Sequence, residues 1–133
     1  MNYVLDASAM IAYLEGELGD TVVAGLLSDP TAVCYAHSLN LCEVFYQGLR
    51  ASNLRTARAA MATLRADGMK ERRDMNRRFW QRVAGHKSRG GISLPDCFCI
   101  TLAQEVGGEV VTSDHGEFDR LVPLGIVPIL FIR

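Results

Sequence analysis

The sequence predicts a single α/β domain, a compact α/β/α sandwich around a short and mainly parallel sheet. Short apolar runs alternate along the chain with segments of helical periodicity. The runs are apolar throughout, as in parallel strands that helices cover on both faces. The chain has 133 residues, of which 49% are hydrophobic, so one ordinary core is expected. Because no linker, repeat or low-complexity segment interrupts it, residues 1–133 are expected to form one domain.

The N-terminal half begins with a short apolar run that ends at Asp6. Ser28-Asp29-Pro30 closes a helical pattern, and Asn53 and Asp67-Gly68 are typical start and stop signals of another helix. In chain order we expect a strand at 3–5, helices at 9–14 and 21–27, a strand at 31–35, and helices at 39–49 and 53–67.

The C-terminal half begins with a weak signal for an extended segment over residues 69–72. Whether the sheet has a third strand there is therefore an open question at this point. Pro95 fits the first turn of a helix, and Gly107-Gly108 fits its end. In chain order we expect a basic helix at 75–85, a flexible turn at 87–91, a helix at 95–106, a strand at 110–112, a short helix at 118–122 and a strand at 126–131.

The formal net charge of −1 is the sum of two opposed blocks. Residues 50–89 carry twelve cations and three acids, a net charge of +9, and the remainder carries −10. The basic block is the natural surface for an RNA backbone, although a merely solvated helix face explains it equally well. The candidate RNA-binding residues are Arg72, Arg73, Arg77 and Arg78. Trp80 could stack on a base, but the spacing of Met75, Phe79 and Val83 favours a core stripe beside it.

The sequence shows no secretory signal and no membrane span, so a soluble, cytoplasmic protein without membrane contact is expected. No Cys-x-x-Cys pair is present, which argues against zinc. We expect the four cysteines to be buried, reduced thiols because they stand in apolar runs. They are Cys34, Cys42, Cys97 and Cys99.

Four carboxylates are expected at one edge of the sheet. Asp6 and Asp114 follow strands, Glu43 lies one turn into the helix after the second strand, and Asp96 lies in the first turn of the helix at Pro95. Ligands of parallel sheets bind at the carboxyl ends of the strands. Acids without His or Cys are hard oxygen ligands, which favour Mg²⁺ or Mn²⁺. One or two such ions, a pair being roughly 3.5–4 Å apart, can activate water for phosphodiester hydrolysis.

Each of these acids also has a simpler interpretation. Asp6 and Asp114 could be helix N-caps, and Asp96 could complement a helix dipole. Glu43 differs because it lies in the apolar run Leu41-Cys42-Glu43-Val44-Phe45, where an unpaired carboxylate is costly. It is less economical to explain all four acids as independent helix caps that happen to lie at one edge of the sheet.

Four motifs resemble those of PIN domains and, more narrowly, of VapC toxins of type II toxin–antitoxin modules. They are Tyr-Val-Leu-Asp-Ala-Ser-Ala (3–9), Ser-Leu-Asn-Leu-Cys-Glu-Val (38–44), Ile-Ser-Leu-Pro-Asp-Cys (92–97) and Val-Thr-Ser-Asp-His-Gly-Glu-Phe-Asp (111–119). The resemblance spans essentially the whole chain. It implies a metal-dependent endoribonuclease that acts on RNA with Mg or Mn, a VapB-type antitoxin and a homodimer.

The resemblance also assigns roles to residues. Asp6, Glu43, Asp96 and Asp114 match the catalytic, metal-binding acids of the family. Asp119 and, with a weaker match, Glu117 fall where some members carry a further acid. Thr112 resembles the polar residue that orients the last motif, and the other supporting positions are Ser8, Ser38 and Asn40.

Other functions remain open at this point. A receiver or phosphatase domain also uses strand-end Asp residues with Mg²⁺, but Asp6-Ala7-Ser8 lacks the second acid that such sites need. A catalytically silent PIN-like module that only binds RNA or protein is a further alternative. Part of the apolar stripe Leu49, Leu54, Met61 and Leu64 could form a dimer or antitoxin surface rather than core.

Overall fold

The five strands of the computed structural model, which describes all residues 1–133, form one entirely parallel sheet. The strands are ordered β3-β2-β1-β4-β5, so β1 lies at the centre, where Val4 pairs with Tyr35 and Val110. Because every pair is parallel, all five carboxyl ends meet at one edge. The bounds are β1 (Asn2–Leu5), β2 (Val33–His37), β3 (Lys70–Arg72), β4 (Glu109–Thr112) and β5 (Ile129–Phe131).

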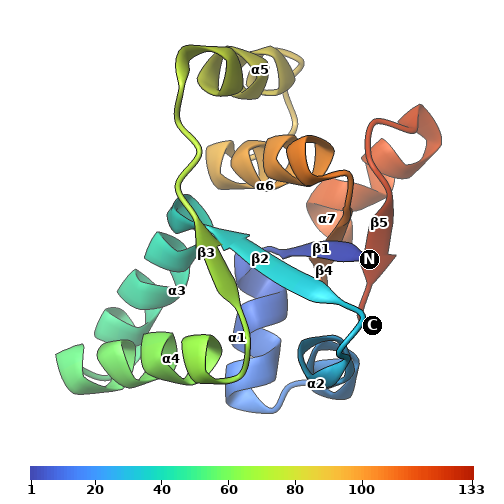
Figure 1. Cartoon of the computed structure of the whole chain (residues 1–133). Helices are drawn as coiled ribbons and strands as arrows, with labels where there is room; N and C mark the ends of the chain where they lie inside the picture. Colours follow the sequence, from blue (N-terminus) through green and yellow to red (C-terminus); the bar gives the residue numbers. More distant parts are fainter.

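Helices cover both faces of this sheet, which confirms the α/β/α class. Figure 1 shows α6 and, outside it, α5 on one side, with α1 to α4 on the other. The helices are α1 (Ala7–Glu15), α2 (Asp20–Ser28), α3 (Ser38–Ala51), α4 (Leu54–Ala66), α5 (Arg77–Ser88), α6 (Leu94–Val106), α7 (His115–Phe118) and the 3₁₀ helix η1 (Asp119–Leu124). None of them is long and apolar enough to span a membrane.

Two apolar clusters form the core, one on each face. Successive strand residues point in opposite directions, so Val4 packs with the α6 cluster and Leu5 with the α1 cluster. Val110 and Val111 divide in the same way. This double burial explains why the central residues of β1 and β4 are apolar on both faces, whereas the edge strand β3 consists of charged residues.

Side chains at the helix starts fix where the helices begin. Asn53 accepts a hydrogen bond from Thr56 N–H at the start of α4, as predicted, and Asn76 accepts one from Phe79 N–H at the start of α5. Each bond satisfies an N–H that has no partner within its helix. The basic helix therefore begins at residue 77 rather than 75, and it continues to Ser88 through part of the predicted turn.

The second strand was predicted two residues too early. Asp29 accepts hydrogen bonds from the N–H and hydroxyl of Thr31, and this local turn delays the strand to Val33. The weak extended signal does correspond to a third strand, which pairs with β2 from Tyr35 to His37. The hydroxyl of Ser38 anchors it by contacting the Glu71 carboxylate at 2.7 Å.

Two burial expectations were partly wrong. Cys34, Cys97 and Cys99 are buried, but Cys42 is exposed because it lies on the outer face of α3. Phe79 and Val83 belong to the core, whereas Met75 is exposed because it precedes the start of α5.

We predict that the Gly108→Ala variant is destabilised by about 1–3 kcal/mol, the usual range for overpacking. A Cβ at Gly108 would lie 2.4 Å from the carbonyl oxygen of Asn2, so the starts of β1 and β4 would have to separate. Denaturant unfolding measures the effect. Gly85→Ala is the control, because nothing lies within 4 Å of a Cβ there, and alanine should stabilise α5 by about 0.5–1 kcal/mol. Equal stability of the two variants would contradict the prediction.

Candidate functional site

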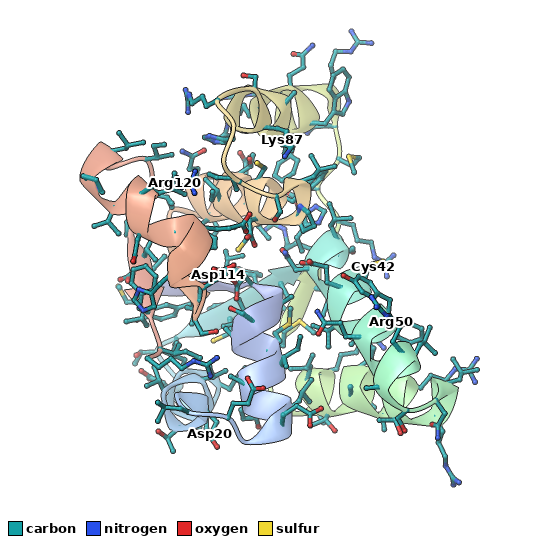
Figure 2. All side chains as sticks on the ribbon, turned by 180° about the vertical axis from the view of Figure 1, so that it is seen from behind. Asp20, Cys42, Arg50, Lys87, Asp114 and Arg120 are labelled. Atoms are coloured by element: carbon teal, nitrogen blue, oxygen red, sulfur yellow. The ribbon has the colours of Figure 1, made fainter.

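An acidic cleft of about 410 Å³ lies at the carboxyl edge of the sheet. Its walls come from the ends of β1 and β4, the starts of α1, α6 and α7, and the inner face of α3. Figure 2 shows this side of the molecule, with Asp114 near its centre. The charged residues that line the cleft are Asp6, Glu17, Glu43, Asp96, Asp114, Glu117 and one cation, Arg133. All four acids that the sequence singled out therefore line one cleft.

Asp6 is the most buried of these acids, with 2% of its surface exposed. One carboxylate oxygen accepts hydrogen bonds from the Ser8 hydroxyl (2.7 Å) and Ala9 N–H (2.9 Å). The other accepts one from the Thr112 hydroxyl. Burial raises the pKa of Asp6 to about 6, although these three hydrogen bonds oppose the shift. Asp6 both caps α1 and lines the cleft, so the two interpretations of this residue are compatible.

Two hydroxyl groups connect Asp6 to the backbone of the loop that carries Asp114. Thr112 Oγ1 accepts a hydrogen bond from Asp114 N–H at 2.9 Å, and Ser8 Oγ accepts one from Ser113 N–H at 3.0 Å. Each hydroxyl proton is then available for Asp6. The supporting positions Ser8 and Thr112 therefore fix Asp6 relative to the Asp114 loop.

Glu43 faces the cleft from α3 and is half-buried. Burial raises its pKa, a hydrogen bond from Asn40 opposes the shift, and the charges of Asp6 and Glu117 add to it. The fully buried amide of Asn40 donates to the Pro95 carbonyl at 3.1 Å and to Glu43 at 3.4 Å. Asn40 thus ties the start of α3 to the start of α6, and its own Oδ1 has no partner.

Three acids place oxygen atoms within 4.8 Å of one another: Asp96, Asp114 and Glu117. Ser93 N–H donates to Glu117 at 2.6 Å, and Glu117 N–H donates to Asp114 at 3.1 Å. Oxygens on opposite sides of Mg²⁺ are about 4.2 Å apart, because each lies about 2.1 Å from the ion. The all-oxygen donor set therefore suits a hard divalent cation. Its spacing of up to 4.8 Å is only slightly wider than the separation of two oxygens across Mg²⁺.

Two of the predicted site residues lie elsewhere. Asp119 is bonded to His115 Nδ1 at 2.7 Å and does not line the cleft. His115 in turn contacts the Arg133 carbonyl and stacks on Phe131, an arrangement that raises its pKa, mainly through the carbonyl. Ser38 holds the third strand rather than an acid of the cleft.

The four arginines expected to contact RNA do not line the cleft either. Arg72 forms two 2.8 Å hydrogen bonds with Asp74 and lies over the ring of Tyr35, and Arg73 lies 3.4 Å from Glu71. These pairings neutralise part of the basic block. Arg77 and Arg78 stay exposed in the first turn of α5.

Sequence reasoning missed several residues of the cleft, among them Ser93, Glu17 and Arg133. Ser93 caps α6 and binds Glu117, and the motif Ser-Leu-Pro-Asp is an N-cap signal that could have indicated the first of these roles. Glu17 and Arg133 lie 3.6 Å apart at the rim. They are 116 positions apart in the chain, and no local pattern predicts such a contact.

Comparisons with known proteins place this geometry in a family. The family model for the PIN domain matches residues 3–122, whereas no curated protein matches the chain in sequence. Among solved structures, VapBC2 from Rickettsia felis, bound to a DNA fragment from its promoter, has a TM-score of 0.75 at 12% identity over 98% of both chains. VapBC from Salmonella typhimurium has a TM-score of 0.73 at 14% identity, covering 100% of this chain and 99% of the other.

A third similar structure is VapC20 from Mycobacterium tuberculosis, described as a sarcin-ricin loop cleaving toxin. Its TM-score is 0.66 at 18% identity, and the match covers 90% of this chain and 95% of the VapC20 chain. At these identities the neighbours show the fold, and the match to the family model covers all four motifs. The chain belongs to the PIN domain family.

Proposed function

We propose that the protein is a metal-dependent endoribonuclease and the toxin of a VapBC-type toxin–antitoxin pair. The observation that carries this proposal is the cleft itself, in which six carboxylates face one arginine at the carboxyl edge of a PIN fold. Such a concentration of negative charge repels a phosphodiester unless cations are present. The cleft is therefore best explained as a cation-binding site that attracts RNA once a cation is bound.

Mg²⁺ or Mn²⁺ fits the donor set, since all ligands are carboxylate oxygens. Asp96, Asp114 and Glu117 would hold the ion, with Asp6 and Glu43 as neighbouring ligands or acceptors of bound water. When bound, the ion supplies Lewis-acid activation of water and compensates charge on the phosphate.

The protein's own groups orient these acids. Ser8 and Thr112 donate hydrogen bonds to the two oxygens of Asp6, which favours its ionised form against burial. Ser93 fixes Glu117 through its N–H and hydroxyl. Asn40 positions Glu43 from a fully buried site. Rigid carboxylates of this kind give a defined geometry at the reacting phosphate.

RNA is the proposed substrate class because the neighbour VapC20 is described as cleaving the sarcin-ricin loop. A catalytically silent module is the competing function. It would need Asp6 only as the N-cap of α1, a role that an uncharged Ser or Asn fills without the cost of burying a carboxylate, so the acidic set favours the enzyme.

A VapB-type antitoxin is the proposed partner, since similar solved structures are VapBC complexes. A groove of about 600 Å³ between α1, α3 and α4 adjoins the cleft, with which it shares Ile11, Glu17 and Gln47. Leu14 and Val44 add apolar surface. An amphipathic antitoxin segment in this groove would reach the rim of the cleft and could block it.

We also propose a homodimer, because part of the expected apolar stripe is exposed on α3 and α4. Leu49 and Leu54 are 40% and 45% exposed, and Tyr46 beside them is 41% exposed, whereas Leu64 is fully buried. Sedimentation of the isolated protein distinguishes a dimer from a monomer.

Asp6→Asn is expected to stabilise the metal-free protein at pH 8 by about 1–3 kcal/mol. The pKa of Asp6 is raised in the folded state, to about 6. Its stabilising contribution is therefore present at low pH and is lost as the pH rises through about 6. Asparagine avoids this loss, so the advantage of the variant should shrink at pH 5. Urea unfolding in EDTA at both pH values measures it, and addition of Mg²⁺ should favour the wild type. A variant less stable than the wild type at pH 8 would exclude this account.

Asp96→Asn is expected to lower the rate of RNA cleavage at least about 100-fold, since even outer partners of metal ligands contribute about 10- to 100-fold. The assay uses purified protein with Mg²⁺ or Mn²⁺ and total RNA, and EDTA should abolish cleavage. Asp119→Asn is the matched control, because Asp119 pairs with His115 outside the cleft, and its rate should stay within about threefold of wild type. RNA cleavage by Asp96→Asn at the wild-type rate would refute the proposal.

Ala60→Arg is expected to abolish capture of the antitoxin, because Ala60 lines the groove beside α1 and α3. Ala59→Arg, one residue earlier in α4 and exposed, should leave capture unchanged. Co-purification with the product of the neighbouring gene tests both. If the two variants capture the antitoxin equally, the groove is not its binding site.

A further inference from the structure

A second pocket lies beside the acidic cleft, between the end of α5 and η1. Its volume is about 400 Å³. The cationic and titratable side chains at its rim are Arg89, Arg120 and His86, and its apolar wall includes Ile92 and Leu121. In Figure 2, Arg120 lies on the opposite side of Asp114 from Arg50.

Two wall segments run from the cleft to the pocket, although no single residue lines both. Glu117 lines the cleft, and Arg120, three residues later, lines the pocket. Likewise Ser93 lines the cleft, and the preceding Ile92 lines the pocket. The 2.6 Å hydrogen bond between Ser93 N–H and Glu117 joins the two wall segments.

The pocket has the opposite charge to the cleft. No carboxylate lines it, and neither Arg89 nor Arg120 has a carboxylate within 4 Å. Arg72 and Arg82, by contrast, are held in 2.8 Å ion pairs with Asp74 and Glu105. Arg89 Nη1 contacts only the ring nitrogen Nδ1 of His86, at 3.3 Å, so neither guanidinium group is neutralised by an acid and both can attract an anion.

The loop at Gly91 is shaped around Arg120. Gly91 has a φ of +78°, and a Cβ there would lie 2.0 Å from Nη1 of Arg120, so no other residue fits without moving the guanidinium. The backbone N–H groups of Gly91 and Ile92 donate to no carbonyl in the protein. The lining of the pocket thus includes two arginines without carboxylate partners and two residues with unpaired main-chain N–H groups, groups that commonly bind phosphate.

We propose that this pocket binds a backbone phosphate of the RNA strand next to the phosphate in the cleft. The inference rests on the proposed nuclease function and assigns residues to its substrate. RNA is favoured over an acidic peptide because the pocket opens beside the site where a phosphodiester would react. The cleft's own charge opposes RNA, since Arg133 is its one cation and is paired with Glu17, whereas Arg89 and Arg120 supply attraction that no acid offsets.

The test measures binding of a single-stranded RNA by fluorescence anisotropy in an Asp96→Asn background, which should prevent cleavage. Arg120→Ala and Arg89→Ala should each weaken binding about tenfold and lower the slope of log K against log salt by about 0.7, the value for one single-strand phosphate contact. Arg120→Lys keeps the charge and should stay within about threefold of the parent. Gly91→Ala should weaken binding because it displaces Arg120. Arg50→Ala, an exposed arginine without an ion pair on α3, should have no effect.

A second measurement places the contact on the RNA. Neutral methylphosphonate linkages are introduced one at a time, and one of them should weaken binding to the parent protein but not to Arg120→Ala. Cleavage assays on the same arginine variants with Asp96 restored should show a raised KM and an unchanged kcat.

The outcomes separate the two proposals. RNA binding that depends on Arg120 in a protein that never cleaves RNA supports the pocket and rejects the nuclease function. Cleavage that is insensitive to both arginines rejects the pocket and leaves the nuclease intact. Loss of antitoxin binding with unchanged RNA binding also rejects the RNA pocket and assigns the surface to an acidic protein segment. A wild-type protein that neither binds nor cleaves RNA overturns both proposals.

Discussion

The buried carboxylate of Asp6 is the constraint around which the functional edge of the fold is organised. It lies at the end of the central strand, where burial raises its pKa to about 6, and three hydrogen bonds offset part of that cost. Those bonds come from Ser8, Ala9 and Thr112, which belong to α1 and β4. The same contacts that keep Asp6 ionisable therefore join three adjacent elements at the carboxyl edge of the sheet.

The separation of charge in the sequence takes a specific form in space. The acids outside the basic block include the whole set in the cleft, whereas four of the twelve cations of the basic block form ion pairs, with partners such as Glu71 and Asp74. Arg89 and Arg120, which come from two distant segments and have no ion pair, line a separate pocket. Counting charge along the chain thus located the basic segment, but only the ion pairs reveal which cations remain free.

Much of the fold and the site could be predicted from the sequence because both depend on local signals. Apolar runs and N-caps specify elements, and parallel strands bring their end residues together, so Asp6 and Asp114 could be placed in advance. Residues governed by long-range contacts could not. Ser38 binds Glu71, 33 positions away, and Asp119 is held by a histidine that the Arg133 carbonyl fixes. Cys42 was misplaced because an apolar run does not tell which side of a helix faces solvent.

Helix capping and a position in the acidic cleft are combined in the same residues of this fold rather than being alternative roles. Asp6 and Asp114 each accept an N–H at the start of a helix, which fixes the carboxylate in one orientation. In each residue one carboxylate oxygen accepts this hydrogen bond. A cap therefore supplies what a metal ligand requires, a rigid and negatively charged oxygen at the edge of the sheet. This coupling explains how a domain of 133 residues can hold several acids close together: the helix starts that it needs for stability also hold the acids of its cleft in place.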